Sequence, residues 1–153
     1  MPPNPKARAS RELRDAVRRR ARGRCEYCHA EESWQYVEFT MEHVTPVSAG
    51  GQTTYENLAL ACFACNRRKW DRLEGFDPLT QTTTRLFNPR LDNWNDHFAW
   101  SEDALRVIGR TPVGRATVEA LELNRERVQQ IRAADVAVGR HPPPEDQRLT
   151  RTE

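Results

Sequence analysis

The sequence predicts a small α+β fold that is held together by a bound metal ion and flanked by helices at both ends. Leu, Ile, Val and Phe account for 28 of 153 residues, below the roughly 20% that a self-supporting apolar core usually needs. The net charge of only +2, with four Trp and five Phe, argues against a disordered chain. The four cysteines form two Cys-x-x-Cys pairs, a spacing typical of the metal sites that stabilise small folds.

Side-chain patterns predict the elements of the first half of the chain. Residues 1–9 are Pro-rich and polar and are expected to be disordered. Ser10 can cap a helix, whose apolar residues recur every four positions and which is expected to stop at Gly23. Residues 34–44 are rich in aromatic and β-branched side chains and predict a strand or a bent hairpin arm. A short helix is expected over residues 66–73.

The second half gives weaker signals. Residues 76–115 contain three prolines and are expected to be irregular, with a short helix around residues 91–98 and a short strand at 107–108. Apolar residues on one side predict a single helix over 116–133.

These patterns divide the chain into four segments. We expect a disordered N-terminus at 1–9, a core at 10–75, an extension packed on that core at 76–135, and a disordered tail at 136–153.

Hydropathy and charge limit the class of protein. The longest apolar run, residues 58–65, has eight residues, whereas a membrane helix needs about 20. The N-terminus lacks the apolar core of a signal peptide, and the two observations together predict a cytoplasmic protein without a membrane partner. Nine of the first 24 residues are basic and two are acidic. This block favours a polyanion partner, although a solvated helix face would have the same composition.

Zinc is the metal that the cysteine spacing favours. The thiolates of Cys25, Cys28, Cys62 and Cys65 can form the closed tetrahedral set of a structural zinc site. Disulfides are not expected in a reducing cytosol, and a thioredoxin-type site needs one pair beside a βαβ pattern. A rubredoxin-like iron site remains an alternative. His29 is not needed as a ligand, because four cysteines complete the set.

An ordered series of polar motifs lies between and after the two cysteine pairs: EHVTP at 42–46, SAGG at 48–51, ENLALAC at 56–62 and CFACNRRK at 62–69. In this order, residues 11–73 resemble the bacterial and phage HNH endonucleases, in the subclass framed by two Cys-x-x-Cys pairs. The resemblance implies a ββα-metal (His-Me) finger, in which two antiparallel strands, a loop and one helix surround a divalent ion. It also implies metal-dependent hydrolysis of DNA.

The residues of these motifs carry the chemistry that the resemblance implies. His43, with an ordinary pKa near ~6.5, suits a general base that takes a proton from water. Glu42 and Asn66 supply oxygen ligands that suit Mg²⁺ or Mn²⁺ rather than zinc. Asn57 is expected to orient the imidazole of His43 through a hydrogen bond. Adjacent strand residues point to opposite faces, so Glu42 and His43 can share one site only where the strand bends or ends.

The sequence departs from the family pattern at two of these positions. Glu42 replaces the more usual Asp, and Asn66 replaces the third His of the family's name with a neutral, weaker ligand. Neither change removes the general base.

Basic residues of two predicted helices are expected to contact DNA phosphates: Arg18, Arg19, Arg22, Arg67, Arg68 and Lys69. Judged alone, these charges would equally suit a solvated helix face. The alternative function is a zinc-stapled module that binds nucleic acid without catalysis.

Overall fold

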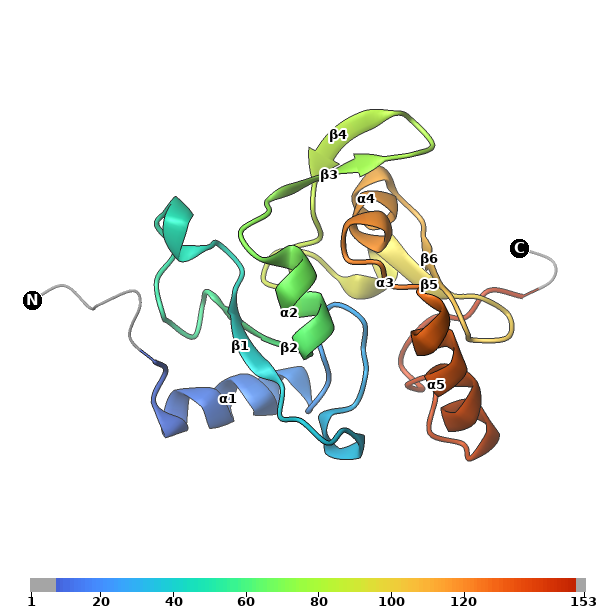
Figure 1. Cartoon of the computed structure of the whole chain (residues 1–153), viewed down its shortest axis with the longest axis horizontal. Coiled ribbons are helices and arrows are strands. Elements are labelled where there is room, and N and C mark those ends of the chain that lie inside the picture. Colours follow the sequence, from blue (N-terminus) through green and yellow to red (C-terminus); the bar gives the residue numbers. More distant parts are fainter. Residues whose placement is uncertain (1–7, 151–153) are drawn as a thin grey trace, which may run out of the picture. The chain divides into compact units, whose positions relative to one another are not determined.

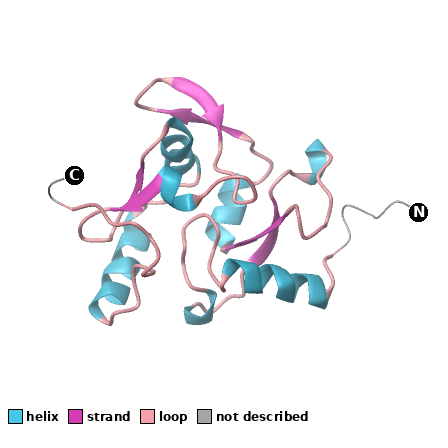
Figure 2. Cartoon of the chain, turned by 180° about the vertical axis from the view of Figure 1, so that it is seen from behind, coloured by secondary structure: helices cyan, strands magenta, loops and turns pink. Residues whose placement is uncertain are grey.

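The structure, a computed structural model, describes residues 8–150 and divides the chain into two compact units (Figure 1). Unit 1 contains the residues up to Leu73 and the segment Asn88–Leu91, and unit 2 contains the rest. Helices alternate with short antiparallel strand pairs, which confirms the α+β fold class (Figure 2). Across the described part of the chain, no helix is long and apolar enough to cross a membrane. Residues 1–7 of the N-terminus expected to be disordered lie outside the described residues.

Helix α1 (Arg11–Ala21) begins and ends where the sequence predicts. Ser10 Oγ accepts a hydrogen bond from Leu13 N at 3.2 Å, and the helix stops as the chain turns left-handed just before Gly23. Val17 is fully buried, and α1 packs against the strand β2 (Leu58–Ala61). The basic helix is therefore part of the core of unit 1 rather than a free arm.

The centre of unit 1 is a pair of strands followed by a helix. Strand β1 (Thr40–His43) pairs antiparallel with β2, all of whose residues are buried. The helix α2 (Phe63–Lys69) follows β2 and contacts β1 (Figure 1). The loop between the strands contains a short 3-10 turn, η2 (Val47–Ala49). The order strand, loop, strand and helix is the one that the resemblance implies.

Three boundaries in unit 1 differ from the expectation, one of them the end of α2, which lies at Lys69 instead of residue 73. Only the end of the expected strand over 34–44 pairs with β2, because a 3-10 turn, η1 (Glu32–Trp34), and an exposed loop precede it. Helix α2 begins before residue 66 because Cys62 caps it: its Sγ accepts a hydrogen bond from Cys65 N at 3.4 Å. The second cysteine pair therefore forms the first turn of the helix, which fixes the spacing of its two sulfur atoms.

Unit 2 is built around buried aromatic rings. Phe87 and Phe98 meet edge to face, with ring centroids 5.1 Å apart. Two hydrogen bonds from Arg115 to Asp77 tie a strand to a helix and lower the pKa of that carboxyl. The elements are β3 (Glu74–Asp77), β4 (Thr82–Arg85), α3 (Trp94–His97), β5 (Phe98–Trp100), β6 (Val107–Gly109), α4 (Pro112–Ala120) and α5 (Glu126–Ala137). The short helix and the short strand are found as α3 and β6, whereas the hairpin of β3 and β4 was not expected.

The single helix expected over 116–133 is wrong. The chain breaks between α4 and α5 because Asn124 pairs with strand β6 instead of continuing a helix. Its Oδ1 accepts from Val107 N at 2.7 Å, and its Nδ2 donates to Val107 O at 2.8 Å. Arg132 holds the same turn by donating to Leu123 O at 2.7 Å.

The expectation of a disordered tail over 136–153 is also wrong for the residues up to 150. The segment after α5 lies along β5 and is bonded to it. Trp100 Nε1 donates to Asp146 Oδ2 at 3.0 Å, and Leu149 N donates to Trp100 O at 2.8 Å. The buried indole of Trp100 provides a partner that the polar composition of the tail could not indicate.

Candidate functional site

The four cysteines gather at one point of unit 1. Their Sγ atoms all lie within 4.8 Å of one another, and Cys28 Sγ and Cys62 Sγ are 3.8 Å apart. Sulfur atoms held tetrahedrally at a Zn–S length of ~2.3 Å would be about 3.8 Å apart, whereas a disulfide requires ~2.05 Å. The free cysteines therefore form a possible zinc site, as their spacing predicts.

The backbone forms a tight turn at each cysteine pair. Cys28 N donates to Cys25 Sγ at 3.5 Å, the counterpart of the bond at the second pair. His29 follows with a φ of 62°, which reverses the chain, and lies outside the four-sulfur cluster. Burial raises the pKa of the Cys25 thiol. A cation bound between the sulfur atoms would therefore be needed to stabilise the thiolate form there.

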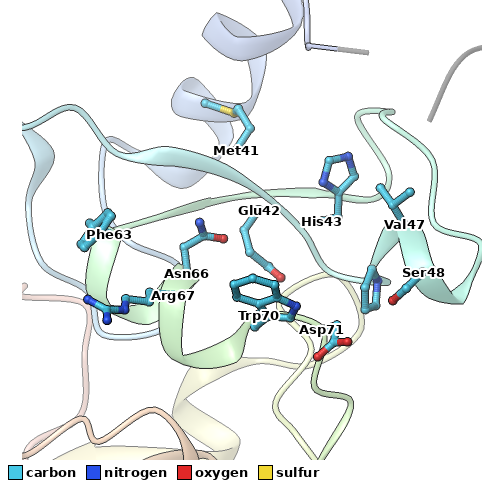
Figure 3. A pocket seen from close by; sticks show the side chains of 11 residues that line it. Met41, Glu42, His43, Val47, Ser48, Phe63, Asn66, Arg67, Trp70 and Asp71 are labelled. Carbon is cyan, nitrogen blue, oxygen red and sulfur yellow. The ribbon is translucent and has the colours of Figure 1, made fainter. Parts of the chain in front are cut away.

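A second site in unit 1 is a pocket of about 540 Å³ beside β1 and α2 (Figure 3). It is lined by Met41, Glu42, His43, Pro46, Val47, Ser48, Phe63, Asn66, Arg67, Trp70 and Asp71. Three of the four expected catalytic residues therefore share one pocket, and Asn57 lies outside its lining.

His43 is the last residue of β1, and its side chain leaves the strand on the side opposite to that of Glu42 (Figure 3). The distance between His43 Nε2 and Thr53 Oγ1 is 2.9 Å, while Nδ1 has no hydrogen-bond partner among residues 8–150. Burial, together with the nearby charge of Lys69, lowers the pKa of His43 from its usual 6.5. At neutral pH the imidazole is therefore uncharged, which is the form that can accept a proton.

Asn57 does not bond to His43 directly, so that part of the expectation is wrong. Its Oδ1 accepts from Thr45 N at 2.9 Å, and its Nδ2 donates to Thr45 O at 3.0 Å and to Gln52 O at 2.8 Å. The amide thus closes the loop between β1 and β2. This loop carries Thr53, so Asn57 and His43 are connected only through the loop backbone.

The glycine pair allows this loop to close tightly. Gly50 has a φ of 90°, a conformation that other residues rarely adopt. A Cβ at Gly51 would lie 1.7 Å from the carbonyl oxygen of Thr45, so no larger residue fits there. The SAGG motif therefore has a structural reason in the shape of the loop.

Glu42 is buried beneath the strand and is fully engaged by other side chains. Lys69 Nζ lies 2.6 Å from Glu42 Oε1, and Tyr27 donates its hydroxyl to Glu42 Oε2 at 2.6 Å. Lys69 also donates to the backbone oxygen of Val44 at 2.9 Å. The side chains of Glu42 and Lys69 are each only 2% exposed. Burial raises the pKa of Glu42, while Lys69 and Tyr27 act against that rise.

This arrangement does not fit the divalent ion expected at Glu42 and Asn66. Asn66 lines the pocket, and its amide has no hydrogen bond within the described chain. The carboxylate of Glu42, by contrast, is already paired with the ammonium of Lys69, which takes the place that a metal ion would need. An ion could bind both residues only after Lys69 moves away, because two cations beside one buried carboxylate repel each other.

The basic residues expected to contact DNA differ in their availability. Lys69 is wrong as a phosphate contact because it is buried against Glu42. Arg18 is engaged in an ion pair with Glu32 at 3.0 Å. Arg19 and Arg67 are exposed and have no ion pair within residues 8–150, so their guanidinium groups are free to contact a phosphate. The roles of Arg22 and Arg68 at DNA remain predictions.

Removing the charge of Lys69 should destabilise the protein strongly. A Lys69→Met substitution would leave Glu42 buried without a counter-charge, and breaking one partner of a buried pair typically costs about 3–5 kcal/mol. The free energy of unfolding, measured with urea in the zinc-loaded protein, should fall by that order. Arg67→Met, two residues away and exposed, should change it by less than about 0.5 kcal/mol. An equal effect of the two substitutions would contradict the importance of the buried pair.

The sequence did not single out three residues that shape this site. Tyr27, between the first two cysteines, is fully buried and bonds to Glu42. Thr53 bonds to His43 from a loop that carries no motif at that position. Trp70 lines the pocket with its side chain 73% exposed. The sequence offered a signal only for Trp70, as a large aromatic residue directly after a basic run.

Comparison with known proteins agrees with this architecture. Residues 25–72, less than half of the chain, match the family model described as HNH endonuclease. The resemblance seen in the motifs is thereby confirmed for this segment, which contains the cysteine cluster, β1, β2 and α2. The match identifies a segment of a nuclease and DNA-binding family. Neither the curated proteins nor the solved structures give a match to the chain.

Proposed function

We propose that the protein is an endonuclease that hydrolyses DNA phosphodiester bonds, with His43 as the general base. The observation that carries this proposal is the position and the hydrogen bonding of the His43 side chain. His43 lines a pocket of the HNH-like segment, its Nε2 is held by Thr53, and its Nδ1 has no bonding partner within residues 8–150.

The proton transfer follows from this arrangement. In the tautomer that donates Nε2–H to Thr53 Oγ1, the lone pair of Nδ1 is available to a water molecule. Nδ1 takes the proton of that water as its oxygen attacks the phosphorus. The bond to the leaving oxygen breaks, and that oxygen takes up a proton from solvent water. Arg67, exposed at the same pocket, is placed to neutralise charge on the phosphate.

A divalent ion in such a site supplies positive charge to the phosphate and to the leaving oxygen. The ammonium of Lys69 is paired with the carboxylate of Glu42. The mechanism proposed for this chain therefore assigns no step to an ion at that carboxylate. Dependence on Mg²⁺ or Mn²⁺ remains a prediction from the resemblance, to be tested by adding each ion to the zinc-loaded protein.

A binding module without catalysis is the second candidate function. The observation that favours it is the closed Glu42–Lys69 pair, which removes one expected ion ligand from the pocket. Binding alone, however, requires neither a neutral His43 nor the loop that holds it.

The pH dependence of cleavage tests the role of His43. Because the base must be neutral, cleavage should be lost as the pH falls through the pKa of His43. That pKa is lowered, so the midpoint should lie below the ordinary value of ~6.5. The measurement is the single-turnover rate against pH, with zinc content and circular dichroism recorded at each pH to exclude unfolding. A rate that stays constant or falls as the pH rises would contradict His43 as the base.

A further inference from the structure

Unit 1 exposes several large aromatic side chains that its own packing does not use. Tyr36, Phe63 and Trp70 are the most exposed of them, with Phe63 60% and Trp70 73% exposed. These two rings line the same pocket as His43. Among residues 8–150, neither ring contacts another aromatic ring, so both are available to a ligand.

The two rings lie at the two ends of α2. Phe63 is the first residue of the helix and Trp70 directly follows its last one, and both line the pocket. In the view of Figure 3 the amide of Asn66 lies between the two rings, and the guanidinium of Arg67 points to the Phe63 end of the helix. The pocket thus offers two aromatic rings, an amide and a guanidinium.

The backbone of Trp70 adopts an unusual conformation. Its φ of 47° and ψ of −117° lie outside the regions that residues with a side chain normally occupy. Such conformations cluster at functional sites. Glycine would adopt this conformation at lower cost, and the exposed indole adds no hydrogen bond within the described residues. Folding alone therefore gives no reason for a tryptophan at the end of α2.

Charge and ring chemistry together identify the ligand. Arg67 is exposed and unpaired within the described chain, which suits a phosphate, and exposed aromatic rings bind the flat faces of bases. Bases inside a regular duplex present their edges in the grooves while their faces are covered by stacking. An aromatic ring can stack on a base only where that base is unpaired or displaced.

We propose that Trp70, assisted by Phe63, stacks on an unpaired base next to the phosphate that enters the pocket. This inference rests on the proposed nuclease function and narrows its substrate class. The preferred DNA is single-stranded or contains unpaired nucleotides, such as a bulge, rather than being a regular duplex. Trp70 is thus a specificity-determining residue, and His43 remains the catalytic one.

Binding of labelled DNA to the full zinc-loaded chain tests the proposal. We would place all variants in a His43→Ala background, which prevents cleavage but keeps the aromatic face. The probes are a fluorescein-labelled single strand, the matching duplex, and that duplex with an unpaired bulge. The single strand and the bulged duplex should bind more tightly than the regular duplex. Trp70→Ala should weaken their binding by about ten- to a hundredfold, the usual effect of losing one base–aromatic stack.

Two further variants separate stacking from other effects. Trp70→Phe keeps an aromatic face and should retain most of the affinity, while Phe76→Ala removes an exposed ring of unit 2 and should change nothing. Equal affinity for the three DNAs, unchanged by Trp70→Ala, would overturn the stacking proposal and leave the nuclease function standing. If the chain bound none of the DNAs, the proposed function itself would fail.

Discussion

Replacing His43 by alanine should lower the rate of DNA cleavage by at least the ~10²–10⁴-fold that a general base contributes. In the proposed mechanism His43 acts on the attacking water in the transition state, so its loss should leave DNA affinity close to that of the parent. The cysteine cluster and the buried pair of Glu42 with Lys69 do not involve the imidazole. Zinc content and melting temperature should therefore also remain near the parent values.

A matched substitution at the partner of His43 makes this prediction sharper. Thr53→Val removes the hydroxyl that holds Nε2 but keeps the base itself. It should lower the cleavage rate less than His43→Ala does, because it affects orientation rather than proton transfer. Asn57→Ala should also lower the cleavage rate, because it removes the hydrogen bonds that close the loop carrying Thr53. If His43→Ala cleaves DNA as fast as the parent, another group is the base and the proposed mechanism is wrong.

Removing zinc should unfold unit 1 rather than merely inactivate it. The cluster joins the turn at Cys25 and Cys28 to the start of α2, and the apolar core around it is small. Zinc contributes about 10–16 kcal/mol to the folding of small zinc-finger peptides. That is comparable with the whole stability of a typical domain, about 5–15 kcal/mol.

The measurement is thermal unfolding of the chain before and after chelation, together with hydrogen exchange at β2. Chelation should abolish the protection of the amides of β2, and restoring zinc should recover it. Cys62→Ser, which leaves three thiolates, should lower the melting temperature sharply. A metal-free protein with an unchanged melting curve would show that the cysteines do not stabilise the fold.

The sequence predicted the parts of the protein that are fixed by local spacing. Two cysteines with two residues between them must form a turn to bind one metal ion, and Ser10 and Gly23 mark a helix through their own backbone preferences. The strand, loop, strand and helix of unit 1 followed from the order of the motifs. All of these features depend on residues close together in the sequence.

The parts that were missed depend on contacts between distant residues. Lys69 looked like a surface charge beside two arginines, but it reaches across to Glu42 on another element. A lone Asn124 is a weak breaker signal, and the bonds that stabilise the break, from Asn124 to Val107 and from Arg132 to Leu123, join residues of different elements. The strands β3 and β4 contain charged residues and a glycine and lack an apolar alternation that would have indicated a hairpin.

Conversion of supercoiled plasmid shows whether this protein cleaves DNA and whether cleavage depends on His43. The zinc-loaded parent and His43→Ala would be purified in parallel and incubated with plasmid, with and without added Mg²⁺ or Mn²⁺. We expect the parent to convert supercoiled DNA to nicked or linear forms and the variant to leave it supercoiled. A folded, zinc-loaded parent that leaves the plasmid supercoiled under all of these conditions would contradict the nuclease function and favour a binding module.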